Sequence, residues 1–568
     1  MISITKLAKC FLLLIISCIP SLVFANTYSA INYTITPGFT GSVPFVKVET
    51  EIKGQLSGKV VVDFPYKWGG VDYTKQIKNF KLDHPQGKAQ LKKHSAIITV
   101  PKTDSIGLAY EVHQKPGNPS NVHETIIRKD LVHAIGNGIF VIPHALQGSD
   151  KKIDFNITWN DIPKDWKTLS SHSIARSFKF VDTTSKLLHA IYVAGNLRIN
   201  QIVDTESPVY LSLYGNFDLP DASITSNLRE IIKAQRAFFN DYDFPYYAIS
   251  IIESDDPSFG GTGLYNSFAG YLPNKTMGKY LPNKSGKFLQ YIFLAHEHFH
   301  NWIGGKIHNN EQEELNYWWT EGFTDYYSRV LALRSGGISL EEFIDECNQI
   351  LRAYYLSPAL NAPNKRIKKD FWRNLDVQKL PYYRGFIFAI YLNYLIKKNN
   401  PDNSLDNVML DLFKNAEHKN FSTPYFEKIV KTYVLLGVSN DVSMFINKGK
   451  TIELNGVSRF LPLEKIKMGS YYLGCNRKAF NKEHIIKKID RRSNAYKAGL
   501  RNGDKIIEWS SMSWQSEKSP DQIITIKTAD KTFEFKPESP YKKNIIYQFK
   551  PNLSQADKDK IKIFFGAK

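Results

Sequence analysis

The stretch "LAHEHFHNWIGG", residues 294–305, places three histidines and one glutamate within five consecutive positions. His296 and His300 are four residues apart, and a helix would bring their imidazoles one above the other at roughly 5 to 6 Å. The surrounding segment repeats apolar residues at helical spacing and contains no proline. It therefore predicts a helix that presents two histidines on one side, while His298 must point elsewhere.

The composition is that of a packed globular protein. A chain of 568 residues has room for three or four domains, and 42% of it is hydrophobic. Two of the four cysteines fall within the first 25 residues, and the other two, Cys347 and Cys475, are far apart, which argues against a disulfide framework. The net charge is +19, but the lysines are scattered and no nucleic-acid-binding motif is present. Nucleic acid is therefore not an expected partner.

Residues 1–25 have the pattern of an export signal: two lysines, an apolar run over 10–24, and a small residue at Ala25 before the cleavage point. The segment 15–18, "IISC", also resembles a lipoprotein cleavage box, but hydrophobic residues continue beyond it, which favours cleavage after Ala25. The apolar run is too short for a membrane anchor, and no later stretch is long enough to span a bilayer. We expect a periplasmic or secreted protein without a transmembrane anchor after signal removal.

Along the mature chain the pattern indicates a multidomain α+β protein. Residues 26–214 contain short β-branched and aromatic runs separated by turn residues, which predict a β-sandwich. Helical periodicity dominates residues 215–455, which predict a mainly α domain. Residues 456–550 return to short strands and glycine turns, and residues 551–568 read as a basic tail.

Two imidazoles do not complete a zinc site, because a catalytic zinc usually takes three protein ligands and leaves one position for water. "YWWTEGFTDYY" supplies Glu321 as a third ligand in a second helical segment. Asp325 follows one helical turn later, where it can accept the spare N–H of a ligating histidine. A bare H-E-x-x-H occurs by chance in many long chains, so Glu321 and Asp325 carry the prediction of one Zn²⁺ per chain.

Glu297 stands beside the first ligand and has a different role. It can reach the metal-bound water, whose pKa the ion lowers to about 7, and take its proton as the water attacks a carbonyl. This is metal-assisted peptide hydrolysis.

These residues resemble a known family. H-E-x-x-H followed by W-x-x-E-G-x-T-x-Y-Y is similar to the gluzincin metallopeptidases, and specifically to the glycyl aminopeptidase family. The resemblance implies a β-rich N-terminal domain, a thermolysin-like catalytic domain, a C-terminal PDZ domain and a peptide or protein substrate. It also implies that His296, His300 and Glu321 are the zinc ligands and that Glu297 is the base.

"LPYYRGFIFAIYLN" resembles the Y-x-K-G segment of these enzymes. By this resemblance Tyr382 stabilises the developing oxyanion with its hydroxyl, and Arg384 occupies the lysine position. A phenol donor aimed at a forming oxyanion in a dry site is physically sensible. Tyr383 is the alternative, because the segment contains two adjacent tyrosines.

One segment departs from the family pattern. The family tends to show G-G-L-E-H-x-N-S, whose glutamate is expected to hold the amino terminus of the substrate, whereas this chain has "GGTGLYNS" over residues 260–267. Gly263 takes the place of that glutamate and has no carboxylate. Gly261, Thr262 and Gly263 still suit an exposed edge strand that binds a peptide by backbone hydrogen bonds. Asp255 or Asp256 could substitute for the missing carboxylate.

The segment 484–510 resembles the core of a PDZ domain, with A-G-L-x-x-G-D between a short helix and a strand. By this resemblance "YYLGCNR" forms the carboxylate-binding loop, with Leu473 and Gly474 at its centre and a peptide C-terminus added beside it as a strand. The alternative is a PDZ fold that only packs against the catalytic domain.

Together these patterns predict an exported, aminopeptidase-like zinc metallopeptidase. Three alternatives remain open at the sequence level. The first is an endopeptidase with the same zinc chemistry, because the amine-holding glutamate is missing. The second is a catalytically weak, PDZ-bearing peptide-binding protein. The third is a hydrolase of another bond, such as an epoxide, at the same metal.

Overall fold

The protein is described here by a computed structural model. The described residues are 26–40, 43–114, 122–203, 208–217, 219–242, 246–254, 260–274, 286–510 and 520–568. The expected export signal, residues 1–25, lies outside them, as do Asp255 and Asp256. No helix within the described ranges has the length and hydropathy needed to span a lipid bilayer.

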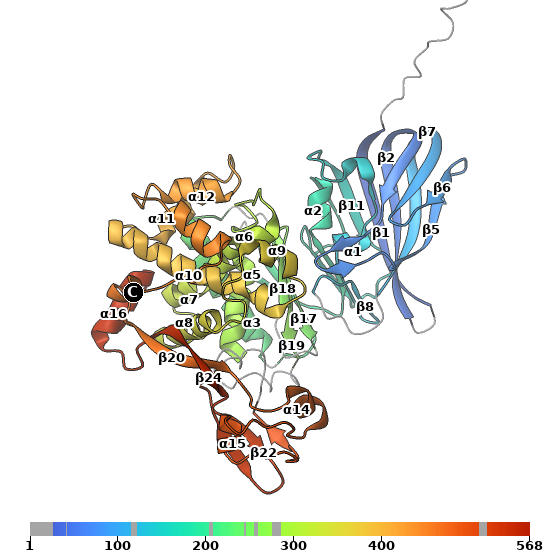
Figure 1. The fold of residues 1–568 in the computed structure, drawn as a ribbon. Coiled ribbons are helices and arrows are strands. Elements are labelled where there is room, and N and C mark those ends of the chain that lie inside the picture. The colour runs from blue at the N-terminus through green and yellow to red at the C-terminus, as the bar shows by residue number, and fades with distance from the viewer. Residues whose placement is uncertain are drawn as a thin grey trace, which may run out of the picture. The chain divides into compact units, whose positions relative to one another are not determined.

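The chain forms two compact units (Figure 1). The first takes the residues up to Thr168 together with Ser173–Gly195, and the second takes Leu169–His172 and Asn196–Lys568. The boundary between the units lies at residues 195 and 196 and not at the expected residue 214, because the next two strands belong to the second unit. The strands β15 (Arg198–Val203) and β16 (Val209–Tyr214) pair with each other, and β16 pairs in parallel with β17 of the second unit.

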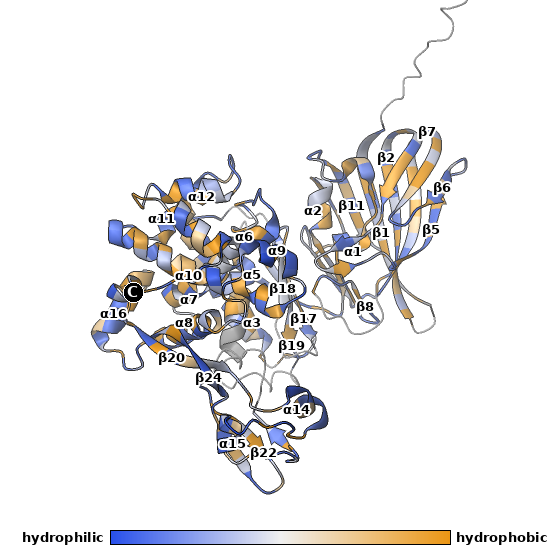
Figure 2. Cartoon of the chain, in the orientation of Figure 1, coloured by the Kyte–Doolittle hydropathy of each residue, from blue (hydrophilic) through white to orange (hydrophobic). Residues whose placement is uncertain are grey.

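Two sheets surround one apolar core in the first unit. The larger sheet has the order β13-β11-β1-β2-β7-β5, and the smaller includes β14-β9-β8. Buried and exposed residues alternate along the long strands, as the mixed colours of β2 and β7 in Figure 2 show. One buried cluster draws side chains from both sheets, which is the arrangement expected of a β-sandwich. The strands are β1 (Thr27–Thr40), β2 (Val43–Asp63), β5 (Ile77–Asp83), β7 (Ser95–His113), β8 (Ile126–Arg128), β9 (Leu131–Ile135), β11 (Ile153–Trp159), β13 (Ser177–Asp182) and β14 (Ile191–Gly195).

The second unit combines a mixed sheet with a group of helices. The sheet has the order β15-β16-β17-β19-β18, so β18 is an edge strand. One apolar cluster joins this sheet to the helices. The remaining elements are β17 (Tyr247–Ser254), β18 (Gly260–Leu264), β19 (Ser267–Pro273), α3 (Asp221–Phe239), α5 (Gly286–Phe299), α6 (Glu313–Thr320), α7 (Gly322–Ser335), α8 (Leu340–Tyr355), α9 (Asn364–Asp370), α10 (Leu375–Asn399), α11 (Leu405–Lys414) and α12 (Thr423–Val430).

A contact between two glycines sets the distance between α10 and the α6–α7 pair. A Cβ at Gly385 would lie 1.8 Å from the Trp318 carbonyl oxygen, and a Cβ at Gly322 would lie 2.5 Å from the Gly385 Cα. No side chain fits there, so the helix backbones touch. Glu321 and Tyr382 lie beside this contact, which holds both close to the same point in space.

The C-terminal region contains a small module with its own core. The long strands β20 (Leu463–Tyr471) and β24 (Glu538–Phe549) pair with each other and contribute to the core of the second unit. Between them lie α14 (Arg477–Glu483), α15 (Asn494–Lys497) and a sheet of β21 (Glu508–Trp509), β22 (Ile524–Lys527) and β23 (Thr532–Phe535). A separate apolar cluster fills this module.

The residues expected to form the carboxylate-binding loop of this module lie in a bend that leads into a helix. Leu473 is buried in the small core, and Gly474 has the positive φ of +81° expected of a tight loop. The residues that follow form the helix α14, whose first turn is capped by the Asn476 side chain on the Ala479 N–H. Binding of a peptide C-terminus at Leu473 and Gly474 stays a prediction.

The expected basic tail is a packed helix instead. Residues Gln555–Phe565 form α16, capped by Ser554 and ended by Gly566 in the left-handed conformation. Ile561, Phe564 and Phe565 are buried in the core of the second unit. The lysines of this helix are exposed or half-buried, which is why the composition indicated only a basic tail.

We expect Phe565→Ala to destabilise the protein by about 3–5 kcal/mol, because it removes a fully buried aromatic side chain. Ile563→Ala is the matched control, since Ile563 is 71% exposed on the same helix. Thermal unfolding of both variants measures the difference. Equal midpoints for the two variants would show that α16 is not packed as described.

Candidate metal centre

The structure brings His296, His300 and Glu321 together. The ligand atoms that these residues offer all lie within 4.8 Å of one another. His296 Nε2 lies 3.1 Å from His300 Nε2 and 3.2 Å from Glu321 Oε2, and His300 Nε2 lies 3.7 Å from the same oxygen. Two nitrogens that bind one tetrahedral zinc at about 2.0–2.1 Å are roughly 3.3 Å apart. The spacing therefore fits a single ion.

A hydrogen bond at Nδ1 fixes the ring orientation of both histidines. His296 Nδ1 lies 3.0 Å from Asp325 Oδ1, and His300 Nδ1 lies 3.2 Å from the Ile303 carbonyl oxygen. Both partners are acceptors, so each Nδ1 carries a proton and Nε2 is the atom that each ring would offer to a metal. The sequence predicted this role for Asp325.

Asp325 is itself held by a buried ion pair. Arg329 donates from Nη1 to Asp325 Oδ1 at 3.0 Å and from Nη2 to Glu346 Oε2 at 3.1 Å. A series of hydrogen bonds thus leads from the candidate metal ligand His296 through Asp325 and Arg329 to the buried Glu346. Such outer contacts orient the ligands and raise their basicity.

The electrostatics of the cluster favour a positive charge between the ligands. Burial opposes a charged imidazole, but Asp325 and Glu321 outweigh it and raise the pKa of His296 to about 10. Burial also opposes a charged Glu321, but His300 and His296 outweigh it and hold the pKa of this carboxyl well below its usual value. Two imidazoles and one carboxylate are the donor set that zinc prefers in hydrolytic sites. The residues present fit that ion.

Glu297 is buried beside the ligands without joining them. Its side chain is 7% exposed, and burial raises its pKa, while the nearby His296 and His300 lower it in part. The edge strand β18 passes directly over it, since a Cβ at Gly261 would lie 2.6 Å from the Glu297 carboxyl carbon. Glu297 is therefore placed between the candidate metal and the strand predicted to bind substrate.

The close approach of β18 also explains Gly263. A Cβ at this position would lie 2.9 Å from the His300 Cβ, closer than real Cβ contacts allow. The strand or the ligand helix would have to move to accommodate a glutamate here. Residue 263 therefore has no carboxylate, and the backbone leaves no space for one.

Tyr382 faces the candidate metal, and its two neighbours do not. Its ring lies 6.1 Å from the His296 ring at an interplanar angle of 22°. Burial and then the charges of Glu321, Asp325 and Glu297 hold its pKa well above the usual value, so the phenol stays protonated and can donate.

Tyr383 and Arg384 are parts of the core. Tyr383 is only 9% exposed, and Arg384 is 1% exposed. Arg384 Nη2 donates to the carbonyl oxygens of Leu360 and Ala362 at 2.9 and 2.8 Å. The residue in the family's lysine position therefore anchors a loop.

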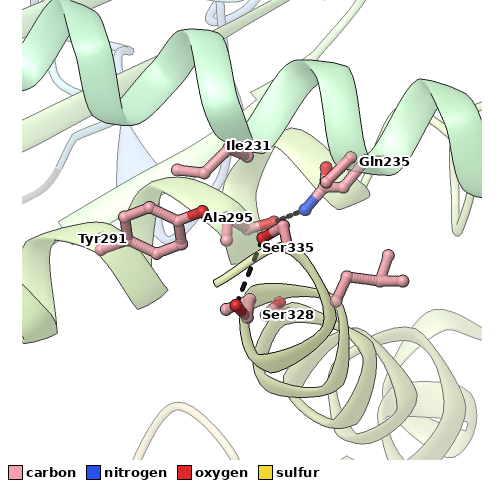
Figure 3. Close-up of a pocket in the computed structure, with 9 residues that line it drawn as sticks. Ile231, Gln235, Tyr291, Ala295, Ser328 and Ser335 are labelled. Carbon is pink, nitrogen blue, oxygen red and sulfur yellow. Dashed lines mark hydrogen bonds between the residues drawn. The ribbon is translucent and has the colours of Figure 1, made fainter. Parts of the chain in front are cut away.

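His298 points away from the ligands, as expected, but it is not a surface residue. It is 2% exposed, and its Nδ1 lies 2.6 Å from Gln235 Oε1. Burial lowers its pKa to about 3, with a contribution from Arg236, so it is neutral. Gln235 also donates to the Ala295 carbonyl at 2.7 Å, so one α3 side chain fixes α5 at two points (Figure 3).

The gap drawn in Figure 3 is a packing feature and not a binding site. Side chains of α3, α5 and α7 line it, on the side of α5 that carries Tyr291 and Ala295. It leaves no room for a ligand.

The sequence reasoning missed four residues around the centre. Arg329 follows Asp325 by four residues, and Lys379 precedes Tyr382 by three, so helical spacing could have placed both. Lys379 Nζ lies 5.1 Å from the centre of the Tyr382 ring. Glu313 precedes Glu321 by eight residues, about two helical turns earlier. Gln235 left no signal, because its partners are distant in sequence.

The sequence comparison bears on this centre directly. Residues 290–378 match the model of the M61 glycyl aminopeptidase family, and the matched segment contains both histidines, Glu297 and Glu321. The chain is an aminopeptidase-like zinc metallopeptidase. The family resemblance seen in the sequence is thereby confirmed for the segment around the metal centre, which ends before Tyr382. No curated protein matches the sequence of this metallopeptidase.

Solved structures extend the likeness to the fold. An aminopeptidase N family protein from Idiomarina loihiensis superposes with a TM-score of 0.68 at 16% identity, covering 93% of this chain and 99% of the other. The M1 zinc metallopeptidase from Deinococcus radiodurans gives a TM-score of 0.44 at 14% identity, covering 76% of this chain and 96% of the other. The first likeness shows a shared multidomain α+β fold for the metallopeptidase.

We expect Asp325→Asn to weaken zinc binding by about 10- to 100-fold, because the anionic acceptor behind His296 is lost while the shape is kept. Competition with a chromogenic chelator measures the dissociation constant. Asp530→Asn, at an exposed position of the C-terminal module, serves as the control. Unchanged zinc affinity in Asp325→Asn would contradict the role of this carboxylate.

Proposed function

We propose that the protein is an exported zinc-dependent peptidase that removes residues from the amino terminus of peptides. His296, His300 and Glu321 hold one zinc ion, Glu297 is the general base and Tyr382 is the oxyanion donor. The observation that carries the proposal is the buried Glu297 beside three convergent ligand atoms. The match of this segment to the glycyl aminopeptidase family supports it.

A zinc ion held by these ligands would polarise the scissile carbonyl and provide a nucleophilic water at neutral pH. Glu297 takes a proton from the attacking water, and its raised pKa brings it closer to the working pH. It then passes this proton to the leaving amine. Tyr382 donates a hydrogen bond to the oxygen on which negative charge develops. The edge strand β18 aligns the peptide by backbone hydrogen bonds.

An endopeptidase with the same residues is the second candidate. The observation that favours it is Gly263, which offers no carboxylate to a free amino terminus and has no space for one. Without an amine-binding group nearby, an extended peptide could run through the site in both directions.

Mass spectrometry on matched peptides tests the proposal. The mature protein is incubated with peptides that have free or acetylated amino termini, before and after chelation. The proposal predicts stepwise loss of single N-terminal residues from free peptides only, and no cleavage after chelation. Internal cuts in both peptide sets would establish the endopeptidase instead.

The proposal also covers the domains and the export signal. Residues 196–455 form a thermolysin-like catalytic domain. The C-terminal module is a PDZ-like domain that packs on it. Arg352 of α8 pairs with Asp521 of that module at 2.9 Å, which supports packing. Residues 1–25 direct export to the periplasm or the medium, and sequencing the amino terminus of the mature protein checks this.

A further inference from the structure

A tight turn after α12 carries two adjacent, exposed leucines (Figure 1 labels α12). The Gly437 N–H donates to the Val434 carbonyl oxygen at 2.7 Å and closes the turn over residues 434–437. Leu435 is 80% exposed and Leu436 is 98% exposed. Among the large apolar side chains that the structure describes, these two are the most exposed. The turn therefore presents a pair of leucines to the solvent.

The segment that carries the leucines is anchored in the core on both sides. Val434 and Val438 are buried in the apolar cluster of the second unit. The Tyr433 hydroxyl donates to Asp411 Oδ2 of α11 at 2.6 Å. Tight turns are usually built from Gly, Pro, Asn, Asp or Ser, so the fold gains nothing from leucine at the two central positions. Two neighbouring apolar side chains on a fixed, protruding turn indicate an interaction surface.

The charges that face the solvent beside this turn are positive. Lys431 directly follows α12, and its Cγ lies 3.9 Å from the place that a Cβ at Gly437 would take. Lys428 lies three residues earlier on the same side of the helix, and both lysines are exposed. The acidic side chains tied to this segment, Glu427 and Asp411, are half-buried, and each accepts a hydrogen bond from a hydroxyl group. A partner that meets the leucines therefore also meets two lysine ammonium groups.

The shape of this surface fits a lipid bilayer better than a protein partner. A specific protein interface buries about 800 Å² on each partner, and two side chains at the tip of a four-residue turn supply only a small part of that area. Insertion into the boundary between headgroups and acyl chains needs no complementary shape. Lysine side chains beside an inserted apolar group extend toward the headgroups and attract anionic lipids.

We propose that residues 428–437 dock the protein on an anionic lipid bilayer. Leu435 and Leu436 insert at the boundary between headgroups and acyl chains, and Lys428 and Lys431 lie beside the lipid phosphates. None of these four residues belongs to the metal centre, so the inference does not depend on the proposed peptidase function. Docking of this kind is reversible, because a single small apolar insertion with two cations gives modest affinity.

Co-sedimentation with vesicles tests the proposal. The full-length, zinc-loaded protein is mixed with vesicles of phosphatidylcholine, either alone or together with phosphatidylglycerol. We expect the double variant Leu435→Ser/Leu436→Ser to bind the mixed vesicles about 10- to 100-fold more weakly, because the apolar insertion is lost. Ile507→Ser/Ile545→Ser is the matched control, since these isoleucines of the C-terminal region are 60% and 58% exposed.

The contribution of the lysines is tested separately. We expect Lys428→Gln/Lys431→Gln to weaken binding to the mixed vesicles by about 10- to 30-fold and to leave binding to uncharged vesicles unchanged. A Leu436→Trp variant reports the depth of insertion, because lipids brominated on their acyl chains should quench its added fluorescence. Equal binding of the unmodified protein to both kinds of vesicle would overturn the role of the lysines.

Three results would overturn the docking proposal. The first is binding by the leucine variant as tight as by the isoleucine control. The second is no binding of the unmodified protein to the mixed vesicles. The third is self-association that the leucine variant abolishes while vesicles bind neither protein, which would assign the turn to a second copy of this chain. Peptide hydrolysis is measured in the same samples, and its absence from all of them would refute the peptidase function alone.

Discussion

Glu297→Gln is expected to lower kcat by roughly 10²- to 10⁴-fold while zinc content stays at the level of the unmodified protein. Glutamine has nearly the same shape, but its amide cannot take a proton from the attacking water. The metal ligands are untouched, because the contacts that orient His296 and His300 are made to Asp325 and to the Ile303 carbonyl and not to Glu297. Burial raises the pKa of Glu297, so a neutral side chain there should not destabilise the fold.

Steady-state kinetics on a free peptide, with zinc measured by mass spectrometry on the same sample, checks this expectation. Glu417→Gln, at an exposed position in the loop after α11, is the control for the same chemical change elsewhere. A Glu297→Gln protein that retains both zinc and full kcat would rule Glu297 out as the base.

Tyr382→Phe is expected to lower kcat by about 10²- to 10³-fold with little change in KM, because the hydroxyl binds charge that develops only in the transition state. The ring, which lies nearly parallel to the His296 ring, is retained. Zinc affinity should therefore remain unchanged.

Tyr383→Phe provides a matched comparison one residue away. Tyr383 is buried in the core, where the charges of Asp325 and Arg329 act on it, so its hydroxyl should contribute little to catalysis. A larger loss of kcat in Tyr383→Phe than in Tyr382→Phe would exchange the roles of the two tyrosines.

Local spacing explains why the sequence predicted which residues the structure brings together at the candidate metal centre. The ligands lie on helices, where residues four apart must share a side, so His296, His300 and the relation of Glu321 to Asp325 follow from the pattern. The edge position of β18 also agrees with its glycine content. These features depend on short segments of chain.

The errors arose where distant segments meet. The domain boundary was placed at residue 214, because β15 and β16 look like the strands before them, and only their pairing with β17 assigns them to the second unit. The glycine contact at Gly322 and Gly385 likewise joins segments more than sixty residues apart and leaves no local pattern.

The expectation for the C-terminus was also wrong. The helix α16 had a readable signal, with a Ser554 cap, apolar residues at Ile561, Phe564 and Phe565, and a closing glycine, but the lysine content obscured it.

Metal titration is the most direct test of the central claim that His296, His300 and Glu321 form a catalytic zinc site. The protein is freed of metal by chelation, and peptide hydrolysis is measured as zinc is added back in known amounts. The account predicts no hydrolysis without metal and a linear rise that stops at one zinc per chain. Hydrolysis by the metal-free protein, or full zinc binding and activity in a His300→Ala variant, would contradict it.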